Sequence, residues 1–306
     1  MKDRSNLTTE QPNPRSAAID RMSTIEVVDT IAAEDARVVP AVRSQRREIA
    51  AAVDLIVERF ARGGRLFYVG AGTSGRLGVL DASEFPPTFG VRPSRVQGII
   101  AGGRRALVRS QEGAEDHADD GAAEIDKRGV RARDVVVGIA ACGVTPFVHG
   151  AVARARRIGA ATAFVTCSPE VKARVRADVV ICPVVGPEVV TGSTRMKAGT
   201  ATKLVLNTLT TGAMIRTGRV YGNLMVDLKA TNAKLRDRSE RIIVELTGLS
   251  RRQARRLLAE ARGEVKAAVV MHVRGLGYRA ARRRLAEADG FLRAALADTD
   301  PTEESP

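Results

Sequence analysis

A short loop rich in glycine and hydroxyl residues follows the first apolar run of the chain. The run is Leu66-Phe67-Tyr68-Val69, and the loop after it is Gly70-Ala71-Gly72-Thr73-Ser74-Gly75, where a helical pattern begins. A strand-to-helix turn of this kind leaves backbone N–H groups free and places the positive end of a helix dipole beside them. Thr73 and Ser74 add hydroxyl donors. The loop therefore predicts a binding site for an anion, contacted by Gly72, Thr73 and Ser74.

The same loop also matches the pattern G-x-G-x-x-G, which occurs in dinucleotide-binding folds. Those folds place an acidic residue at the end of the second strand, where it binds the ribose of the cofactor. Here the second apolar run ends in Ile99-Ile100-Ala101-Gly102-Gly103, which contains no acid. A dinucleotide site is thus disfavoured. It remains an alternative to the anion site, as does a purely structural tight turn.

Two further loops of small and hydroxylated residues precede helical patterns. Ala140–Pro146 follows the apolar run Val135–Ile139, and Gly192–Lys197 leads into a helical pattern from about 195 to 217. Because the carboxyl ends of parallel strands meet at one edge of a sheet, three such loops would converge there and would suit a phosphate and sugar hydroxyls. Charge from Arg195 or Lys197 could add to the site, but either residue could instead form a salt bridge. The contacts predicted in these two loops are Gly143, Thr145, Ser193, Thr194 and Lys197.

Two glutamates stand where an acid and a base could act. Glu84 lies about three helical turns beyond the anion loop, before Pro86-Pro87, which we expect to end that helix. The apolar neighbours Phe85 and Phe89 would raise the pKa of its carboxyl, as a general acid requires. Glu115 lies at the front of a helical pattern, where the helix dipole would keep it ionised, as a base requires. The alternatives are an exposed helix-end charge and a simple helix-start residue.

The histidines and the loop cysteine are weaker candidates. His117 and His149 have no carboxylate partner at a readable spacing, so we expect both on the surface. Cys142 lies near the second loop without a visible His or Asp partner, and we expect a small loop residue there.

Short apolar runs separated by helical patterns make up the middle of the chain. Most of these runs are rich in β-branched residues and lack strict alternation, which is typical of strands buried on both faces of a parallel sheet. We therefore predict an α/β fold with a doubly wound, five-stranded, mainly parallel sheet. The expected strands are Leu66–Val69, Val96–Ile100, Val135–Ile139, Ala163–Val165 and Val179–Cys182.

Helical patterns flank this region on both sides. We expect two helices between 23 and 61, divided near Val39-Pro40, and a small all-helical unit after the sheet. The C-terminal helices are expected at 237–246, 250–261, 264–273 and 278–297, without a tandem repeat. The predicted domains are an irregular N-terminal arm (1–20), N-terminal helices (21–56), a sugar-phosphate domain (57–220), a helical C-terminal domain (221–297) and a disordered tail (298–306).

The bulk composition disfavours several classes of protein. The chain has 306 residues, 44% of them hydrophobic, and no apolar run approaches the roughly 20 residues that a membrane span needs. The polar N-terminus lacks the apolar stretch of a signal peptide, and three scattered cysteines suit a reducing cytoplasm. A net charge of +14 invites a nucleic-acid partner, but the excess lies in C-terminal arginines without stacking aromatics. We expect a solvated helix face there, and neither a nucleic-acid nor a membrane partner.

The loops and one longer motif resemble a known family. Gly70–Gly75 and Cys142–Thr145 resemble the two phosphate loops of sugar isomerase (SIS) domains. The run from Gly186 to Asn207 resembles the signature shared by N-acetylmuramic acid 6-phosphate etherases and glucokinase regulatory proteins. The regulatory proteins carry two SIS domains in a longer chain, so the length favours the etherases. Four further segments resemble the bacterial etherases, and the resemblance covers most of residues 6–297. These segments are Leu7–Gln11, Asp81–Gly90, Glu112–Asp116 and Gly222–Leu228.

The resemblance implies a function and a set of roles. It implies a cytoplasmic homodimer, with its site near the subunit interface, that has neither a metal nor a redox cofactor. It implies cleavage of the D-lactyl ether of N-acetylmuramic acid 6-phosphate into N-acetylglucosamine 6-phosphate and D-lactate, within cell-wall recycling. Glu84 would be the acid for the ether oxygen and Glu115 the second acid/base, although the sequence does not decide between the two assignments. The alternatives are a sugar-phosphate-sensing regulator and a sugar-phosphate isomerase on the same fold.

The second loop departs from the family pattern. The family usually has a serine where this chain has Cys142, and often an arginine where it has Val144. A thiol is a weaker hydrogen-bond donor than a hydroxyl. We therefore expect a weaker substrate contact there, or one carried by Gly143 N–H and Thr145, which leaves room for a shifted substrate preference.

Overall fold

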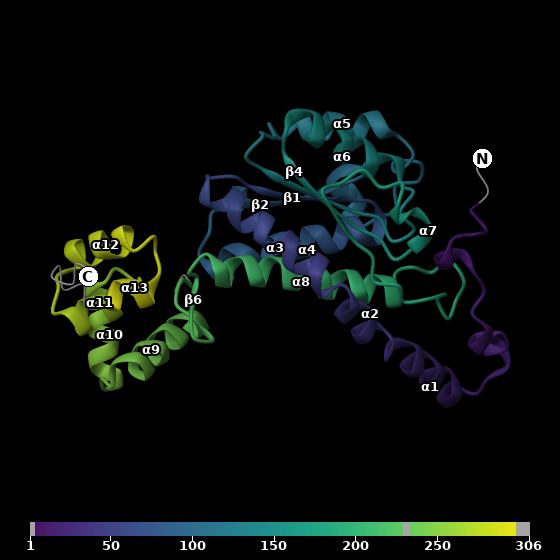
Figure 1. Ribbon diagram of the computed structural model, residues 1–306. Helices are drawn as coiled ribbons and strands as arrows, with labels where there is room; N and C mark the ends of the chain where they lie inside the picture. Colours follow the sequence, from purple (N-terminus) through teal and green to yellow (C-terminus); the bar gives the residue numbers. More distant parts are fainter. Residues whose placement is uncertain (1–3, 229–232, 298–306) are drawn as a thin grey trace, which may run out of the picture. The chain divides into compact units, whose positions relative to one another are not determined.

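The computed structural model describes residues 4–228 and 233–297 (Figure 1). The chain forms two compact units. Unit 1 comprises Met1–Ser83 and Pro93–Ala213, and unit 2 comprises Glu84–Arg92 and Met214–Pro306. This grouping differs from the expected boundary at 220/221, because the short segment 84–92 belongs with the C-terminal helices. The tail predicted at 298–306 lies outside the described residues.

Unit 1 is built around a five-stranded parallel sheet with the strand order β2-β1-β3-β4-β5. This confirms the predicted α/β fold. Its strands are buried on both faces, as their apolar runs indicate. Because β1 lies between β2 and β3, the winding reverses at β1/β3, and ligands of such sheets bind outside the carboxyl ends of the strands at this point. The strands are β1 (Leu66–Gly70), β2 (Val96–Ile100), β3 (Val135–Ile139), β4 (Ala161–Val165) and β5 (Val179–Ile181).

Two helices cover one face of the sheet, α5 (Ala118–Lys127) and α6 (Pro146–Ile158) (Figure 1). Their apolar side chains form one core cluster with Phe67, Val69 and Phe164 of the strands. Alternate residues of β1 therefore point to this face, as the period of two in a strand requires.

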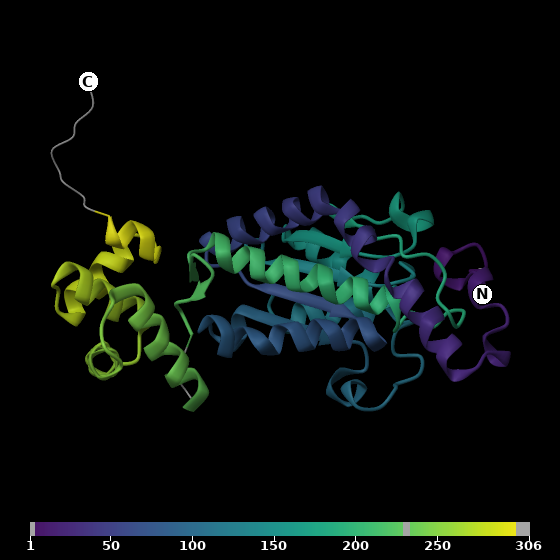
Figure 2. The same cartoon turned by 90° about the horizontal axis from the view of Figure 1, so that it is seen from below.

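Three longer helices cover the other face: α3 (Arg46–Ala61), α4 (Gly72–Phe89) and α8 (Lys197–Arg216). Figure 2 shows α8 running between α3 and α4. Tyr68, between Phe67 and Val69 in β1, points to this face, since a Cβ added at Gly78 of α4 would lie 2.8 Å from the Tyr68 Cβ. The chain enters α4 directly from β1, so the anion loop joins the sheet to this layer.

The prolines near the end of α4 do not stop the helix where we expected. The helix continues through Pro86 and Pro87 to Phe89. A proline in the last turns removes N–H donors without disturbing a long stretch of following helix. The rings of Phe85 and Phe89, one helical turn apart, lie 5.5 Å from each other, and both side chains are buried, which holds this last turn in place.

The N-terminal arm and helices precede the sheet. The arm contains three short 3-10 turns, and the predicted helical stretch contains three helices rather than two. The division expected near Val39-Pro40 lies a few residues earlier, at Ala36-Arg37; Pro40 itself is the third residue of its helix, where no intrahelical bond is lost. The turns are Thr8–Glu10, Pro14–Ser16 and Ile19–Arg21, and the first two helices are α1 (Thr24–Asp35) and α2 (Val38–Ser44).

Short elements complete the list for unit 1. They are the 3-10 turns Pro93–Arg95 and Gly103–Leu107 and the helix α7 (Pro169–Lys172). In the described residues of both units, no helix is long and apolar enough to cross a membrane.

In its described residues, unit 2 contains a small hairpin and five helices around a core of its own. The predicted helix at 278–297 is two helices, because the chain turns at Asp289-Gly290 with both residues at positive φ. The strands are β6 (Val220–Tyr221) and β7 (Leu224–Met225), and the helices are α9 (Ala233–Thr247), α10 (Arg251–Glu260), α11 (Val265–Arg274), α12 (Tyr278–Glu287) and α13 (Leu292–Leu296).

Unit 2 contains a tandem repeat of 27 residues, which corrects our expectation of none. Residues 242–268 align with 269–295 without a gap, and 13 of the 27 positions are identical, including Leu-Ala-Glu-Ala at 258–261 and 285–288. The structure repeats at the same interval: α12 starts and ends 27 residues after α10, and α13 starts 27 residues after α11. The repeat is hard to recognise in the sequence because alanine and arginine recur throughout this segment.

The backbone of the turn is the same in both copies. Arg262 and Asp289 are the two non-glycine residues with positive φ in the described chain, at 55° and 51°, and each is followed by a glycine. Gly263 N–H donates to the Leu258 carbonyl at 2.8 Å, and Gly290 N–H donates to the Leu285 carbonyl at 2.7 Å. The two copies therefore close their helices with one shared turn type.

Candidate functional site

The first loop has the open geometry that an anion site needs. Gly70 ends β1 and Gly72 begins α4, with φ of +50° and no atom within 4 Å of an added Cβ. The N–H groups of the first helical turn have no acceptor within the helix. At Gly75 the space is closed instead, since a Cβ would lie 2.6 Å from Cγ1 of Ile100. Thr73 and Ser74 between these glycines are half-buried.

The second loop is held tightly from within. Gly143 has a φ of +74°, and a Cβ there would meet the Thr166 hydroxyl at 2.8 Å, so a glycine is required. Its N–H donates to the Ala140 carbonyl at 2.9 Å, and its carbonyl lies 2.7 Å from Nε2 of His149. That N–H is used within the turn, so the predicted contact through Gly143 N–H is not available; Thr145 is buried and Cys142 is half-buried.

A pocket of about 140 Å³ joins the anion loop to a predicted catalytic residue. Gly72 and Glu115 both line it, together with Arg76 of α4 and Glu112. A backbone hydrogen bond holds the turn that contains Glu115 against the start of α6, since the Glu115 carbonyl accepts from Phe147 N–H at 3.0 Å. The Glu115 side chain remains exposed.

The third loop reaches the first loop at the start of α8. A Cβ added at Gly199 would lie 3.4 Å from the Thr194 carbonyl and 3.7 Å from the Thr73 methyl group. The Thr194 N–H bonds to the Gly192 carbonyl at 2.9 Å, and Ser193 and Thr194 are both half-buried. Atoms of Thr73 and of Thr194 therefore both lie beside Gly199, in the first turn of α8.

Glu84 is on the surface of α4 near its end. Phe85 and Phe89, which we expected to surround it, point into the core while Glu84 is exposed. The described chain alone therefore does not supply the apolar setting that would raise the pKa of an acid. Its catalytic role stays a prediction.

Comparison with known proteins identifies the family. Residues 48–156 match the family described as the glucokinase regulatory protein N-terminal SIS domain. The N-acetylmuramic acid 6-phosphate etherase of Gloeobacter violaceus is 56% identical over 271 residues, which cover 89% of each chain. That of Symbiobacterium thermophilum is 58% identical over 264 residues, covering 86% of this chain and 88% of the relative. This chain belongs to the N-acetylmuramic acid 6-phosphate etherase family.

Among solved structures, a phosphoheptose isomerase from Francisella tularensis is similar at 14% identity and a TM-score of 0.46. The match covers 61% of this chain and 98% of the isomerase.

Two residues of this etherase-family chain were missed by reasoning from sequence. Arg76 follows the anion loop by one residue and lines the pocket with Glu115, while its Nε donates to the Leu107 carbonyl at 3.1 Å. His149 orders the second loop through the Gly143 carbonyl and stacks on Phe164, instead of lying free on the surface. Arg76 could have been found from its place in the first helical turn. His149 acts through a backbone carbonyl, and no sequence pattern marks that.

Lys197 differs most from its prediction. It is 1% exposed, its ammonium binds the Glu34 carboxylate, and it also donates to the Pro187 carbonyl at 2.6 Å. Of the two alternatives considered for it, the salt bridge is the one observed. Arg195, two residues earlier, is exposed.

Two of the three cysteines are poor nucleophiles. Burial raises the pKa of Cys182 to about 11 and that of Cys167 further, so both thiols are protonated at neutral pH. Cys142 is half-buried beside the second loop.

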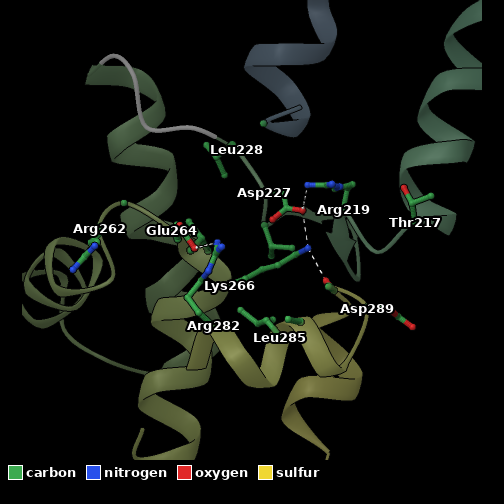
Figure 3. Close-up of a pocket in the computed structure, with 16 residues that line it drawn as sticks. Thr217, Arg219, Asp227, Leu228, Arg262, Glu264, Lys266, Arg282, Leu285 and Asp289 are labelled. Atoms are coloured by element: carbon green, nitrogen blue, oxygen red, sulfur yellow. Dashed lines mark hydrogen bonds and ion pairs between the residues drawn. The ribbon is translucent and has the colours of Figure 1, made fainter. Parts of the chain in front are cut away.

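A separate cavity of about 830 Å³ lies within unit 2 (Figure 3). Figure 3 shows Arg219 and Lys266 converging on Asp227, at 3.0 and 2.7 Å, while Arg282 pairs with Glu264 at 2.8 Å. These three cations share two carboxylates, and Arg262 also lines the cavity.

Proposed function

We propose that this chain cleaves the D-lactyl ether of N-acetylmuramic acid 6-phosphate, producing N-acetylglucosamine 6-phosphate and D-lactate. Relatives of that name match it closely over nearly nine-tenths of its length. The observation that carries the proposal is the pocket lined by both Gly72 and Glu115, because it places an anion loop beside a carboxylate that can move a proton.

The reaction needs two proton transfers. In the open-chain sugar, the C1 aldehyde makes the C2 proton acidic, and a carboxylate removes it. The C3–O bond then breaks as a carboxylic acid protonates the departing lactyl oxygen, which gives D-lactate and an unsaturated aldehyde. Water adds to that aldehyde, its oxygen to C3 and a proton to C2, and restores the sugar. We assign these transfers to Glu84 and Glu115, with Glu84 at the ether oxygen and Glu115 at C2.

The substrate is held by its phosphate and hydroxyl groups. Gly72, Thr73 and Ser74 bind the phosphate at the start of α4, where the helix dipole favours negative charge. Thr145, Ser193 and Thr194 lie on the neighbouring loops and take the remaining polar contacts. Arg76 adds a cation at the same pocket. Lys197 is left out of these contacts because its ammonium is engaged in the interior.

We also propose that the chain acts as a cytoplasmic homodimer with the site near the subunit interface. The pocket of about 140 Å³ is smaller than the roughly 300 Å³ of typical ligand sites, so it accommodates part of a substrate. Both catalytic glutamates are exposed in the single chain. A second subunit over the pocket would enclose the substrate and exclude water from the reacting atoms.

Release of D-lactate from N-acetylmuramic acid 6-phosphate by the purified chain tests the activity. We expect equal amounts of lactate and N-acetylglucosamine 6-phosphate. In water labelled with oxygen-18, the label should appear at C3 of the sugar and not in lactate, because elimination precedes hydration. Label in the lactate would exclude this mechanism, and absence of release with intact binding would exclude the etherase.

Substitution of the glutamates tests their roles. Glu84→Gln and Glu115→Gln should each lower kcat about 10²- to 10⁴-fold while sugar-phosphate binding is retained. Full activity in Glu115→Gln would show that its role is wrong.

The second candidate is a sugar-phosphate sensor, which the match of residues 48–156 to the regulatory-protein family favours. A sensor would bind the sugar phosphate without turnover. An isomerase would instead give a ketose phosphate and no lactate.

A further inference from the structure

Three charged side chains come together in the interior of unit 1. Lys197 at the start of α8, Glu34 in α1 and Glu188 are each 1% exposed. The Lys197 ammonium binds Glu34 across 163 positions of sequence and also donates to the Pro187 carbonyl. The Glu188 carboxylate accepts the backbone N–H of Lys197 at 3.0 Å and that of Ala198 at 2.9 Å, so it caps α8.

The N-terminal arm adds neutral contacts to this group. Asn13 Nδ2 donates to Glu34 at 2.9 Å and to the Pro187 carbonyl at 3.0 Å. Ser16 Oγ donates to the Val189 carbonyl at 2.8 Å. The arm therefore binds the backbone of 187–189 through Asn13 and Ser16, while Glu188 joins the same segment to the start of α8.

The charges of the group are costly to bury. Burial by itself would raise the pKa of Glu34, but hydrogen bonds from Lys197 and Asn13 together with nearby cations outweigh it, so its pKa lies below the ordinary value. Burial raises the pKa of Glu188. A buried ion pair is often no more stabilising than apolar side chains of equal volume, so its use here points to geometry rather than to stability.

The segment held in this way leads directly to the third substrate loop. Pro187 to Val189 are fixed by the contacts above, and Ser193 and Thr194 follow before the chain enters α8 at Lys197. Both ends of this short connection are thereby anchored. Atoms of Thr194 and of Thr73 in the anion loop both lie beside Gly199, so we expect a shift of the connection to move Thr194 relative to the anion loop.

We infer that Lys197, Glu34 and Asn13 are positioning residues that hold the Ser193-Thr194 hydroxyls against the anion loop for sugar-phosphate binding. The inference rests on the proposed function. It makes the N-terminal arm part of the scaffold of the site, although no arm residue need touch the substrate. Lys197 acts through the loop backbone and not as a phosphate ligand.

Dissociation constants for N-acetylglucosamine 6-phosphate in the full-length chain test the inference. Asn13→Ala, Glu34→Gln and Lys197→Met should each weaken binding about tenfold or more, since each disturbs contacts that hold a hydrogen-bonding loop. In turnover the same variants should raise KM more than they lower kcat, because the loop binds ground state and transition state alike. Lys127→Met, which breaks a surface pair with Glu124 at 2.9 Å, is the matched control and should bind as the wild type does.

The pattern across the variants separates the explanations. Weaker binding in Lys197→Met alone would make Lys197 a direct ligand and would overturn the inference. Lower thermal stability with unchanged binding in Asn13→Ala, which leaves no buried charge unpaired and should fold, would also overturn it. If the wild type binds the sugar phosphate but releases no lactate, the etherase proposal fails and the binding test of positioning still stands. If the wild type binds no sugar phosphate, both the etherase proposal and the positioning inference are wrong.

Discussion

At the scale of single residues, the pocket beside the anion loop joins a cation to a carboxylate. Arg76 and Glu115 line it together, one from the first turn of α4 and the other from the turn before α5. The loop itself supplies only partial charges from N–H groups and a helix dipole. The guanidinium of Arg76 adds a full positive charge to this pocket, where we propose that the phosphate binds.

We predict that Arg76→Met raises KM for the sugar phosphate at least about tenfold, with a smaller effect on kcat, because a charged hydrogen bond is lost. Steady-state kinetics measure this. Arg104→Met, an exposed position in the nearby turn Gly103–Leu107, serves as the control and should leave KM unchanged. An unchanged KM in Arg76→Met would remove Arg76 from the substrate contacts.

The second loop allows an opposite change. Cys142 is half-buried where the family usually has a serine, and the Gly143 N–H beside it is already used within the turn. Cys142→Ser replaces a weak donor by a hydroxyl, so KM should fall by up to about tenfold. A rise in KM would show that the thiol is matched to this chain's own substrate.

At the scale of elements, the buried pair of α1 and α8 predicts a dependence of stability on pH. The Glu34 pKa lies below its ordinary value of 4.5, so the unfolded chain takes up the proton first as the pH falls. Stability from this group is present above about pH 4.5 and is lost as the pH falls through the folded-state value. The pKa of Glu188 is raised, so its contribution to the stability increases as the pH falls.

Urea unfolding between about pH 7 and pH 3 measures this effect, because the Glu34 contribution is lost only below about pH 4.5. Glu34→Gln should lose less stability over that range than the wild type does, because the substituted group no longer titrates. Equal losses in the two proteins would mean that Glu34 is not the titrating group. The raised Glu188 pKa remains in both proteins and cancels from the comparison.

The repeat of unit 2 makes its own prediction about helix starts. Ser250 and Gln253 form a capping box at α10, whereas the equivalent positions before and in α12 are Gly277 and Ala280. A Cβ at Gly277 would meet no atom within 4 Å. Gly277→Ser with Ala280→Gln should therefore stabilise the chain by about 0.5 to 1 kcal/mol. Chemical denaturation measures this, and a loss of stability would show that the two copies differ at this turn.

At the scale of the whole molecule, the small pocket and the exposed glutamates predict a second subunit. Light scattering should give a mass twice the 32.7 kDa of the chain. Dilution that yields monomers should reduce activity in parallel, since a monomer would leave the substrate open to water. Full activity in a confirmed monomer would contradict the proposed interface.

Much of unit 1 could be predicted from sequence because its signals are local. Buried strands appear as short apolar runs, and the glycines of 70–75 mark a turn whose N–H groups must be free. All five strands were found within two residues. The end of α4 was not, because the packing of Phe85 against Phe89 carries the helix past two prolines.

The sequence alone determined the succession of strands along the chain, the chemistry available in the three loops and the resemblance to a family, since each depends on neighbouring residues. Tertiary structure decided which side chains meet. It paired Lys197 with Glu34, placed Arg76 in one pocket with Glu115, and gave His149 a backbone carbonyl to hold. Such partners lie up to 163 positions apart, and only the folded chain brings them within hydrogen-bond distance, because burial makes any unpaired charge costly.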